Sequence, residues 1–291
     1  FMFKSASGAG GFYTHQIASS LRNSVAQDGT LKFTAGTPSS STKMTMSYWV
    51  KKYTNSTNGA DSNIFIAGTD GNNSISHHFD TGPEFWSLGQ GGNWGGNYLV
   101  SNAKVRDTSA WYHVVWRYDS TQGTAADRVR LYANGKEVTS WRVSTMHGQV
   151  AEDEAFSYIN ADGVVQSFGG ISGVGPHAAE GADLQMAEIV FNDGQSYGPT
   201  SYGEFKNGVW IPKDPSGLTF GNNGYWLKMA AGAIGADSSG NSNNFTVANI
   251  AAHDVMLDSP TFNSDSNGGN FCTYNPLTPV GLSMDLMALS E

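Results

Sequence analysis

The stretch over residues 111–138, WYHVVWRYDSTQGTAADRVRLYANGKEV, constrains the fold more than any other part of this 291-residue chain. Side chains alternate between two faces at every second position from residue 112 to 118, and again from 128 to 133. A period of two is typical of a strand with one buried face. Asn134-Gly135 follows, and this pair suits a type I′ turn because both positions need positive φ. The stretch therefore predicts an antiparallel meander, with residues 136–141 as the return strand.

Further short strands are expected on both sides of this meander. Residues 44–52 alternate cleanly, and strands are also predicted at 31–33, 64–67, 75–79, 84–88, 156–159, 164–168, 184–191 and 225–229. Turn residues recur about every 10 residues, as in sandwiches. The pattern predicts an all-β, antiparallel two-sheet jelly-roll sandwich over residues 30–229, preceded by an arm over 1–29. A loop-rich C-terminal extension over 230–291 is expected to carry short helices at 248–257 and 282–289. Ser201 and Glu204 form a capping-box pattern that predicts one more short helix.

Composition excludes several functions. Charged residues make up 14% of the chain, well below the usual ~25%, and 25 acidic residues outnumber 16 basic ones. Because the chain has no run of Lys or Arg, we expect no nucleic-acid binding through phosphate contacts. No apolar stretch is long enough for membrane insertion. Cys272 is the single cysteine, which excludes an internal disulfide and a thiolate metal cluster.

Two resemblances follow from these motifs. The WYHVV segment followed by RLYANGKE resembles the core hairpin of the laminin-G and concanavalin A-like family, which contains both lectins and glucanases. The resemblance therefore implies a concanavalin A-like fold more firmly than a function.

A longer series of motifs is similar to lectin-like proteins of marine bacteriophages, described as tail-fibre-like or structural virion proteins. The series comprises MAEIVFNDGQSYGPTSYGEFKNGVWIPK at 186–213, NNGYWLK at 222–228, GADSSGNSNNFTV at 235–247, DSPT at 258–261 and NFCTYNPL at 270–277. This resemblance implies a non-enzymatic virion protein and no catalytic residues.

The glycine loop at residues 89–98, GQGGNWGGNY, is the candidate ligand site. Trp94 lies between glycine pairs, where an exposed indole can stack on a sugar ring. Asn93 and Asn97 offer amide groups to sugar hydroxyls, and Tyr98 and Trp86 complete the predicted set. The alternatives are that Trp94 packs on the sandwich or on another subunit, and that Trp86 and Trp141 belong to the core or its rim.

Metal and catalytic sites have weaker support. Calcium is the one possible cofactor, and three oxygen-rich loops could hold it, beginning at Asp70, Asp237 and Asp265. Each loop has a single carboxylate, however, and turns formed by Asp and Asn explain the same residues. Neighbouring strand residues face opposite ways, so the pair His77 and His78 does not form a metal site, and His113 is expected to pack or hydrogen bond. The same alternation makes Glu152-Asp153-Glu154 a poor acid–base pair for glycoside hydrolysis.

These observations predict a non-enzymatic bacteriophage virion surface protein with a lectin-like domain, in a fibre, tail or capsid-surface position. Its expected partners are other virion proteins and host-surface glycan. A homo-oligomer, with a trimer favoured, is expected from the class and not from particular residues. Two alternatives remain: an architectural capsid decoration or joining protein without a sugar site, and a glycan hydrolase on the same fold.

Overall fold

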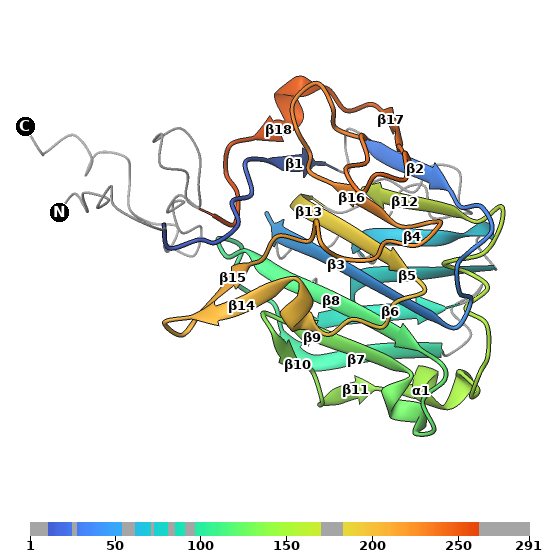
Figure 1. Ribbon diagram of the computed structural model, residues 1–291. Coiled ribbons are helices and arrows are strands. Elements are labelled where there is room, and N and C mark those ends of the chain that lie inside the picture. The colour runs from blue at the N-terminus through green and yellow to red at the C-terminus, as the bar shows by residue number, and fades with distance from the viewer. Residues whose placement is uncertain are drawn as a thin grey trace, which may run out of the picture.

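The computed structural model describes residues 11–24, 28–53, 62–70, 73–80, 85–90, 97–169 and 183–261. Within this part, the strands form two eight-stranded antiparallel sheets that pack face to face (Figure 1). The first sheet runs β10 (Lys136–Glu137), β9 (Val129–Ala133), β8 (Tyr112–Asp119), β3 (Lys43–Lys52), β13 (Leu184–Asp193), β1 (Ser20–Asn23) and β18 (Val255–Met256), with β16 (Tyr225–Leu227) also paired to β13. The second runs β11 (Trp141–Val143), β7 (Asn97–Lys104), β6 (Phe85–Gln90), β5 (Asn73–Asp80), β4 (Ser62–Asp70), β12 (Val165–Gly169), β2 (Thr30–Thr34) and β17 (Thr246–Ala248). The predicted all-β sandwich is confirmed.

The remaining described elements are small. A separate hairpin joins β14 (Gly203–Lys206) to β15 (Val209–Pro212), and it projects from the body of the molecule (Figure 1). One short α-helix, α1, spans Thr145–Gln149. Single 3₁₀ turns cover Ala125–Asp127, Pro199–Ser201 and Ala252–Asp254.

The core follows from the alternation read in the sequence. On β3 and β8 the inward positions carry large side chains that are fully buried, including Tyr48, Trp116 and Tyr118. The second sheet contributes Phe65, Phe79, Leu88, Leu99 and Phe168 to the same cluster. His77 also points inward, where its Nε2 lies 2.6 Å from the Tyr118 hydroxyl, whereas His78 faces the other way toward Ser76. Burial lowers the pKa of His77 well below its usual value, so this ring is a neutral core residue.

Four local predictions are wrong, each because tertiary packing overrides a local pattern. The expected return strand over residues 136–141 is divided, since β10 pairs with β9 in the first sheet and β11 pairs with β7 in the second. Residues 156–159 form turns, in which Phe156 and Ile159 cap the core as loop residues. The capping-box segment makes one 3₁₀ turn and then enters β14, where the Glu204 carboxylate accepts a hydrogen bond from Thr14. The segment expected as a helix over 248–257 has one 3₁₀ turn, and 282–289 lies outside the described residues.

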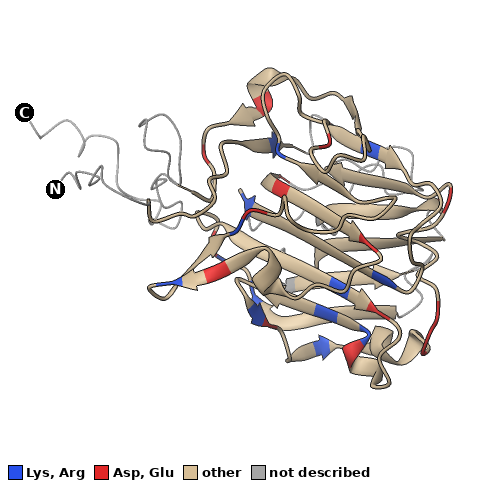
Figure 2. Cartoon of the chain, viewed as in Figure 1, with Lys and Arg blue, Asp and Glu red and all other residues tan. Residues whose placement is uncertain are grey.

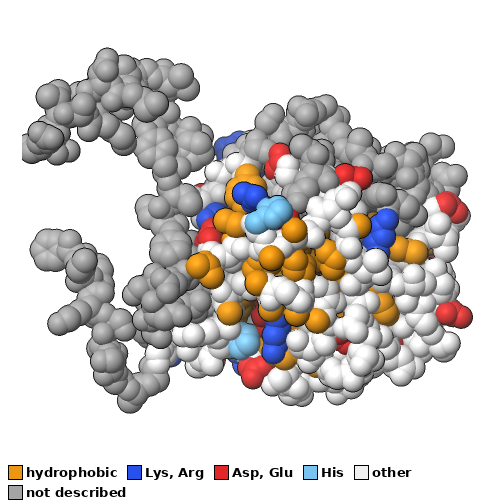
Figure 3. Space-filling model, turned by 90° about the horizontal axis from the view of Figure 1, so that it is seen from above, with side chains coloured by type: hydrophobic (Ala, Val, Ile, Leu, Met, Phe, Trp, Pro, Cys, Tyr) orange, Lys and Arg blue, Asp and Glu red, His pale blue; other side chains and the backbone are white. Residues whose placement is uncertain are grey.

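Both lateral ends of the sandwich are closed in the same way. Residues 136–143 supply an edge strand to each sheet, and residues 246–256 do so at the opposite end. The sheets thus include β17 and β18, which follow residue 229, and β1, which precedes residue 30. These edge strands are two or three residues long, which limits edge-to-edge pairing with other chains. Around β17 and β18, apolar side chains gather on the face seen from above (Figure 3).

A third layer covers part of the outer face of the first sheet. Residues 11–17 run across this face, held by the pair His15–Glu188 at 2.9 Å and by a hydrogen bond from the Ile17 amide to Thr261. Residues 194–220 lie beside them, and Tyr202 and Phe220 pack on outward-facing Val115 and Val190. Strands normally exposed on one side are thus buried on both.

Charges of both signs are spread over the described surface. Lys and Arg are interspersed with Asp and Glu and form no continuous basic stripe (Figure 2). None of the described helices is long or apolar enough to cross a lipid bilayer.

Candidate functional site

The structure separates the side chains predicted to bind a ligand in the glycine loop. Trp86 is 2% exposed and packs between the sheets against Phe79 and Tyr112, so it belongs to the core and not to a surface site. Asn97 and Tyr98 begin β7 and are half-buried, and the Tyr98 amide donates to the Thr145 hydroxyl of α1. Asn93 and Trp94 lie outside the described residues.

The described acidic loops are organised by protein hydrogen bonds. Asp237 accepts bonds from the backbone amides of Trp226, Ser239 and Asn243 and from the Ser239 hydroxyl, two at each carboxylate oxygen. Asp70 accepts bonds from the amide and side chain of Asn73. Asp265 lies outside the described residues. Within the described part, no three His, Cys, Asp or Glu side chains gather at metal-binding distance.

A groove of about 510 Å³ lies between the projecting hairpin and the outer face of the first sheet. We call it the aromatic groove, and it is lined by Tyr13, Trp49, Trp111, Ala133, Asn134, Lys136, Phe205, Gly208, Val209, Trp210 and Pro260. Its volume lies within the range of roughly 300–1,000 Å³ that is typical of small-molecule sites. Five of its lining side chains are aromatic, and they come from four separate segments of the chain.

Buried hydrogen bonds behind the groove fix its floor. The Trp210 indole donates to His113 Nδ1 at 3.0 Å, and His113 Nε2 lies 2.8 Å from the Ser47 hydroxyl. Since Nδ1 must accept, the neutral ring carries its proton on Nε2 and donates to Ser47. Burial lowers the pKa of His113 to about 3, which keeps this tautomer across the neutral range. The predicted structural role of His113 is thereby confirmed.

Two glycines leave room for the Trp210 ring. A Cβ at Gly135 would lie 2.3 Å from Trp210 Cζ3, and one at Gly203 would lie 2.5 Å from Cζ2. Gly135 also has φ +77°, so the turn predicted from Asn134-Gly135 needs glycine both for its backbone and for this contact. The indole is therefore held between a turn of the first sheet and the start of β14.

The opposite wall is held by an ion pair. Lys51 is 2% exposed and donates to Asp258 Oδ2 at 2.8 Å, while the Trp111 indole donates to Oδ1 at 3.2 Å. Since Asp258 precedes Pro260, this contact places Pro260 at the groove.

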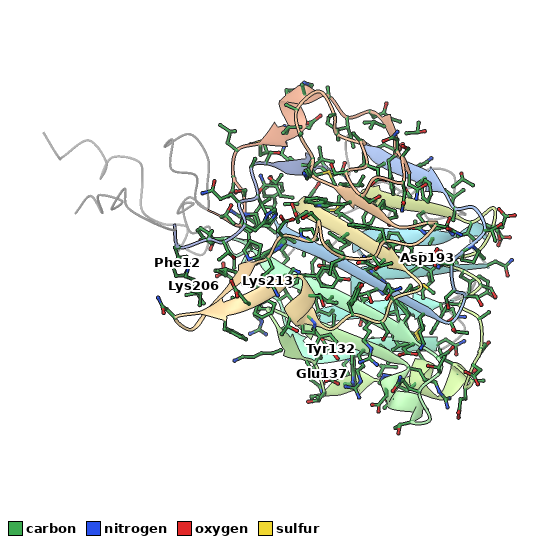
Figure 4. All side chains as sticks on the ribbon, in the orientation of Figure 1. Phe12, Tyr132, Glu137, Asp193, Lys206 and Lys213 are labelled. Atoms are coloured by element: carbon green, nitrogen blue, oxygen red, sulfur yellow. The ribbon has the colours of Figure 1, made fainter. Side chains whose placement is uncertain are left out.

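The rim offers both apolar and polar groups to a ligand. Phe205 and Val209, on the hairpin, are 52% and 51% exposed, and the Phe205 ring meets Trp210 edge-on at 4.9 Å. Lys136 is exposed at the other side. Asn134 Oδ1 accepts from the His113 amide, so its Nδ2 group is the donor available to a ligand. Figure 4 shows Lys206 beside Phe12 at the hairpin, where the ammonium lies 5.6 Å from the ring centre.

The aromatic groove was not predicted, although the sequence of its projecting hairpin contains a recognisable turn pattern. The segment at 203–212 has two short alternating runs around Asn207-Gly208, whose φ values of +51° and +82° match those of the first turn. An Asn-Gly pair flanked by alternating residues predicts a hairpin. Phe205 and Trp210 face each other across it.

The fold and the groove define a class: a two-sheet jelly-roll sandwich with an aromatic surface groove. A family model described as the concanavalin A-like lectin/glucanases superfamily matches residues 25–171, about half of the chain. The chain belongs to this superfamily. A search of curated proteins found no match.

A solved structure supports the fold. A protein from Bacteroides ovatus, provisionally described as carbohydrate binding, is 17% identical with a TM-score of 0.53, covering 84% of this chain. The chain spans 61% of the length of that protein. A heptameric SAP-like pentraxin from Limulus polyphemus is 16% identical with a TM-score of 0.41, covering 61% of this chain and 77% of the pentraxin. At 17% identity the likeness to the Bacteroides protein concerns the fold alone.

Proposed function

We propose that this chain is a non-catalytic carbohydrate-binding module that holds a glycan chain in the aromatic groove. The observation that carries the proposal is the groove itself, in which the exposed ring of Phe205 and the half-buried rings of Tyr13 and Trp210 stand beside amide and ammonium donors. The C–H faces of sugar rings stack on aromatic side chains, while their hydroxyl groups need polar partners. The groove volume suits several linked sugar rings. The superfamily and the fold of the Bacteroides protein agree with a ligand of this kind.

Binding without hydrolysis is favoured by the groove's chemistry. Glycosidases place two carboxyl groups on opposite sides of the scissile bond. Among the described residues, no carboxylate lines the aromatic groove. Glu152 and Glu154 lie in an exposed turn, where they contact Arg128 and the Ala151 amide.

We further propose that the module works at the surface of a bacteriophage virion, in a fibre, tail or capsid-surface position, as a homo-oligomer that binds host glycan. The support is the ordered motif series from residue 186 to 277, which resembles virion proteins of marine phages. Antibody labelling of phage particles that encode the chain tests its location. Light scattering after size-exclusion chromatography tests the trimer, which a monomer at all concentrations would contradict.

A glycan array tests the binding. We expect the chain to bind neutral oligosaccharides, and Phe205→Ala to weaken that binding about tenfold because one stacking surface is lost. Leu257→Ala is the matched control, since Leu257 is 56% exposed and does not line the groove. If Phe205→Ala and Leu257→Ala bind alike, the groove is not the site. No binding to any glycan, together with tight incorporation into virions, would favour an architectural role. New reducing ends after incubation with glucans would favour a hydrolase.

A further inference from the structure

A second, smaller pocket lies at the edge of the sandwich where the chain crosses from β10 to β11. We call it the edge pocket. It measures about 200 Å³ and is lined by Ala126, Asp127, Val129, Arg130, Glu137, Val138, Thr139, Trp141, Ser144 and His147. Glu137 lies beside Tyr132 in Figure 4, on the part of the molecule that carries β9 and β10.

A fixed guanidinium forms one side of the edge pocket. Arg130 donates to Glu137 Oε2 at 3.1 Å and makes a short ion pair with Asp127 Oδ1. These contacts use one oxygen of each carboxylate. Both acidic side chains are about one-third exposed, and the second oxygen of each carboxylate is the acceptor that remains for a ligand. The Arg130 guanidinium and the Asp127 and Glu137 carboxylates are thus already held in place, with hydrogen-bond donors and acceptors side by side, before a ligand binds.

An indole and an imidazole form the other side. Trp141 is half-buried, and the His147 ring meets it edge-on at 5.7 Å. His147 Nε2 lies 3.2 Å from the Val129 carbonyl, which can only accept, so Nε2 donates and Nδ1 is left as an acceptor in the neutral ring. Burial lowers the pKa of His147, which favours this neutral form near pH 7.

The chemistry of the pocket selects among ligand classes. An apolar ring beside alternating donors and acceptors is complementary to a sugar ring, which has C–H faces and hydroxyl edges. The charged groups sum to −1 with neutral His147, which disfavours anionic sugars. A divalent cation is disfavoured too, because Arg130 already occupies the space between the carboxylates and repels it. The small volume limits the occupant to about one ring.

We propose that the edge pocket is a second carbohydrate site, which takes a single neutral pyranose. This proposal takes its ligand class, a carbohydrate, from the proposed function, but the edge pocket is lined by different residues from the aromatic groove. The two sites lie on opposite sides of β10, since Lys136 lines the groove and Glu137 lines the edge pocket. One glycan with a side branch could therefore meet both, with the second contact strengthened by its high effective concentration.

Saturation-transfer NMR on the full chain tests the inference with methyl glycosides of glucose, galactose and mannose as probes and sialic acid as an anionic comparison. We expect signals from at least one neutral glycoside and none from sialic acid. Trp141→Ala and Glu137→Ala should remove those signals, while Trp141→Phe should keep most of them because an aromatic surface remains. Lys136→Ala and Phe205→Ala are the matched controls, and they should weaken oligosaccharide binding in the groove without changing the monosaccharide signals. Melting temperatures of all variants show that each is folded.

Each alternative outcome has a distinct meaning. Monosaccharide signals that persist in both Trp141→Ala and Glu137→Ala, or that vanish in Phe205→Ala, would overturn the second site. A chain that binds oligosaccharides through the groove but shows no neutral monosaccharide signal would overturn it as well and leave the proposed function standing. Absence of binding to oligosaccharides and monosaccharides alike would overturn both proposals.

Discussion

Replacing Gly135 with alanine tests how the aromatic groove is built. The position has φ +77°, and an added Cβ would lie 2.3–2.7 Å from three atoms of the Trp210 ring. Gly208 is the matched control, because it follows an asparagine in a turn of the same kind, has φ +82° and has no atom within 4 Å of an added Cβ. The two substitutions share the backbone penalty and differ in the clash.

The expected magnitudes follow from these contacts. The left-handed conformation costs a non-glycine residue about 1–2 kcal/mol, and this applies at both sites. At Gly135 the indole must also move, which adds about 1–3 kcal/mol for overpacking and about 1 kcal/mol for the lost hydrogen bond to His113. We therefore expect Gly135→Ala to lower the free energy of unfolding by about 2–4 kcal/mol more than Gly208→Ala does.

Urea unfolding followed by circular dichroism measures the difference. A double-mutant cycle with Trp210→Ala isolates the clash, since Gly135→Ala should then cost about as much as Gly208→Ala. Oligosaccharide binding should weaken in Gly135→Ala because one wall of the groove is displaced. Equal destabilisation by the two glycine substitutions, within about 0.5 kcal/mol, would refute the reasoning about the Trp210 contact.

Three further predictions concern polar groups, two of them buried and the third half-buried. The pKa of His113 is about 3 in the folded chain and about 6.5 in the unfolded chain. Between these pH values the unfolded chain binds more protons than the folded chain does. The free energy of unfolding therefore falls as the pH drops through this window, by up to about 1.4 kcal/mol per pH unit. Urea midpoints from pH 7 to 4 should therefore fall less steeply in His113→Gln than in the wild type. Asp193 is fully buried, and its carboxylate accepts hydrogen bonds from the Ser39, Ser40 and Asn223 amides and from the Asn160 side chain. Asp193→Asn should therefore lower the free energy of unfolding in urea by about 3 kcal/mol. The control Asp107→Asn, at an exposed position, should lower it by less than about 1 kcal/mol. Protein donors occupy both carboxylate oxygens of Asp237, so EDTA should leave the melting temperature unchanged, whereas Asp237→Ala should lower it. A lower melting temperature after addition of EDTA to the wild type would instead indicate a bound cation.

The local sequence determined the strands and the turns. The alternation at residues 44–52 and 112–118 predicted which side chains enter the core, because successive residues of a strand face opposite sides of a sheet. Asn134-Gly135 predicted its own turn, since positive φ is a property of those two residues. The same alternation correctly separated His77 from His78 and gave His113 a structural role.

The tertiary structure decided which segments meet. No local pattern says that the indole of Trp210 lies against Gly135, 75 positions earlier, or that residues 136–143 divide between two sheets. The sequence allowed core or rim positions for both Trp86 and Trp141, and the structure places Trp86 in the core and Trp141 at a pocket on the edge. A period-two pattern assigns a residue to one of the two faces of a strand. What packs against that face depends on how distant strands pair and on which segments cover each sheet. The aromatic groove forms between segments far apart in the chain, whereas the edge pocket forms where one stretch, residues 126–147, crosses from the first sheet to the second. In both cases the pairing of the strands brings the lining side chains together.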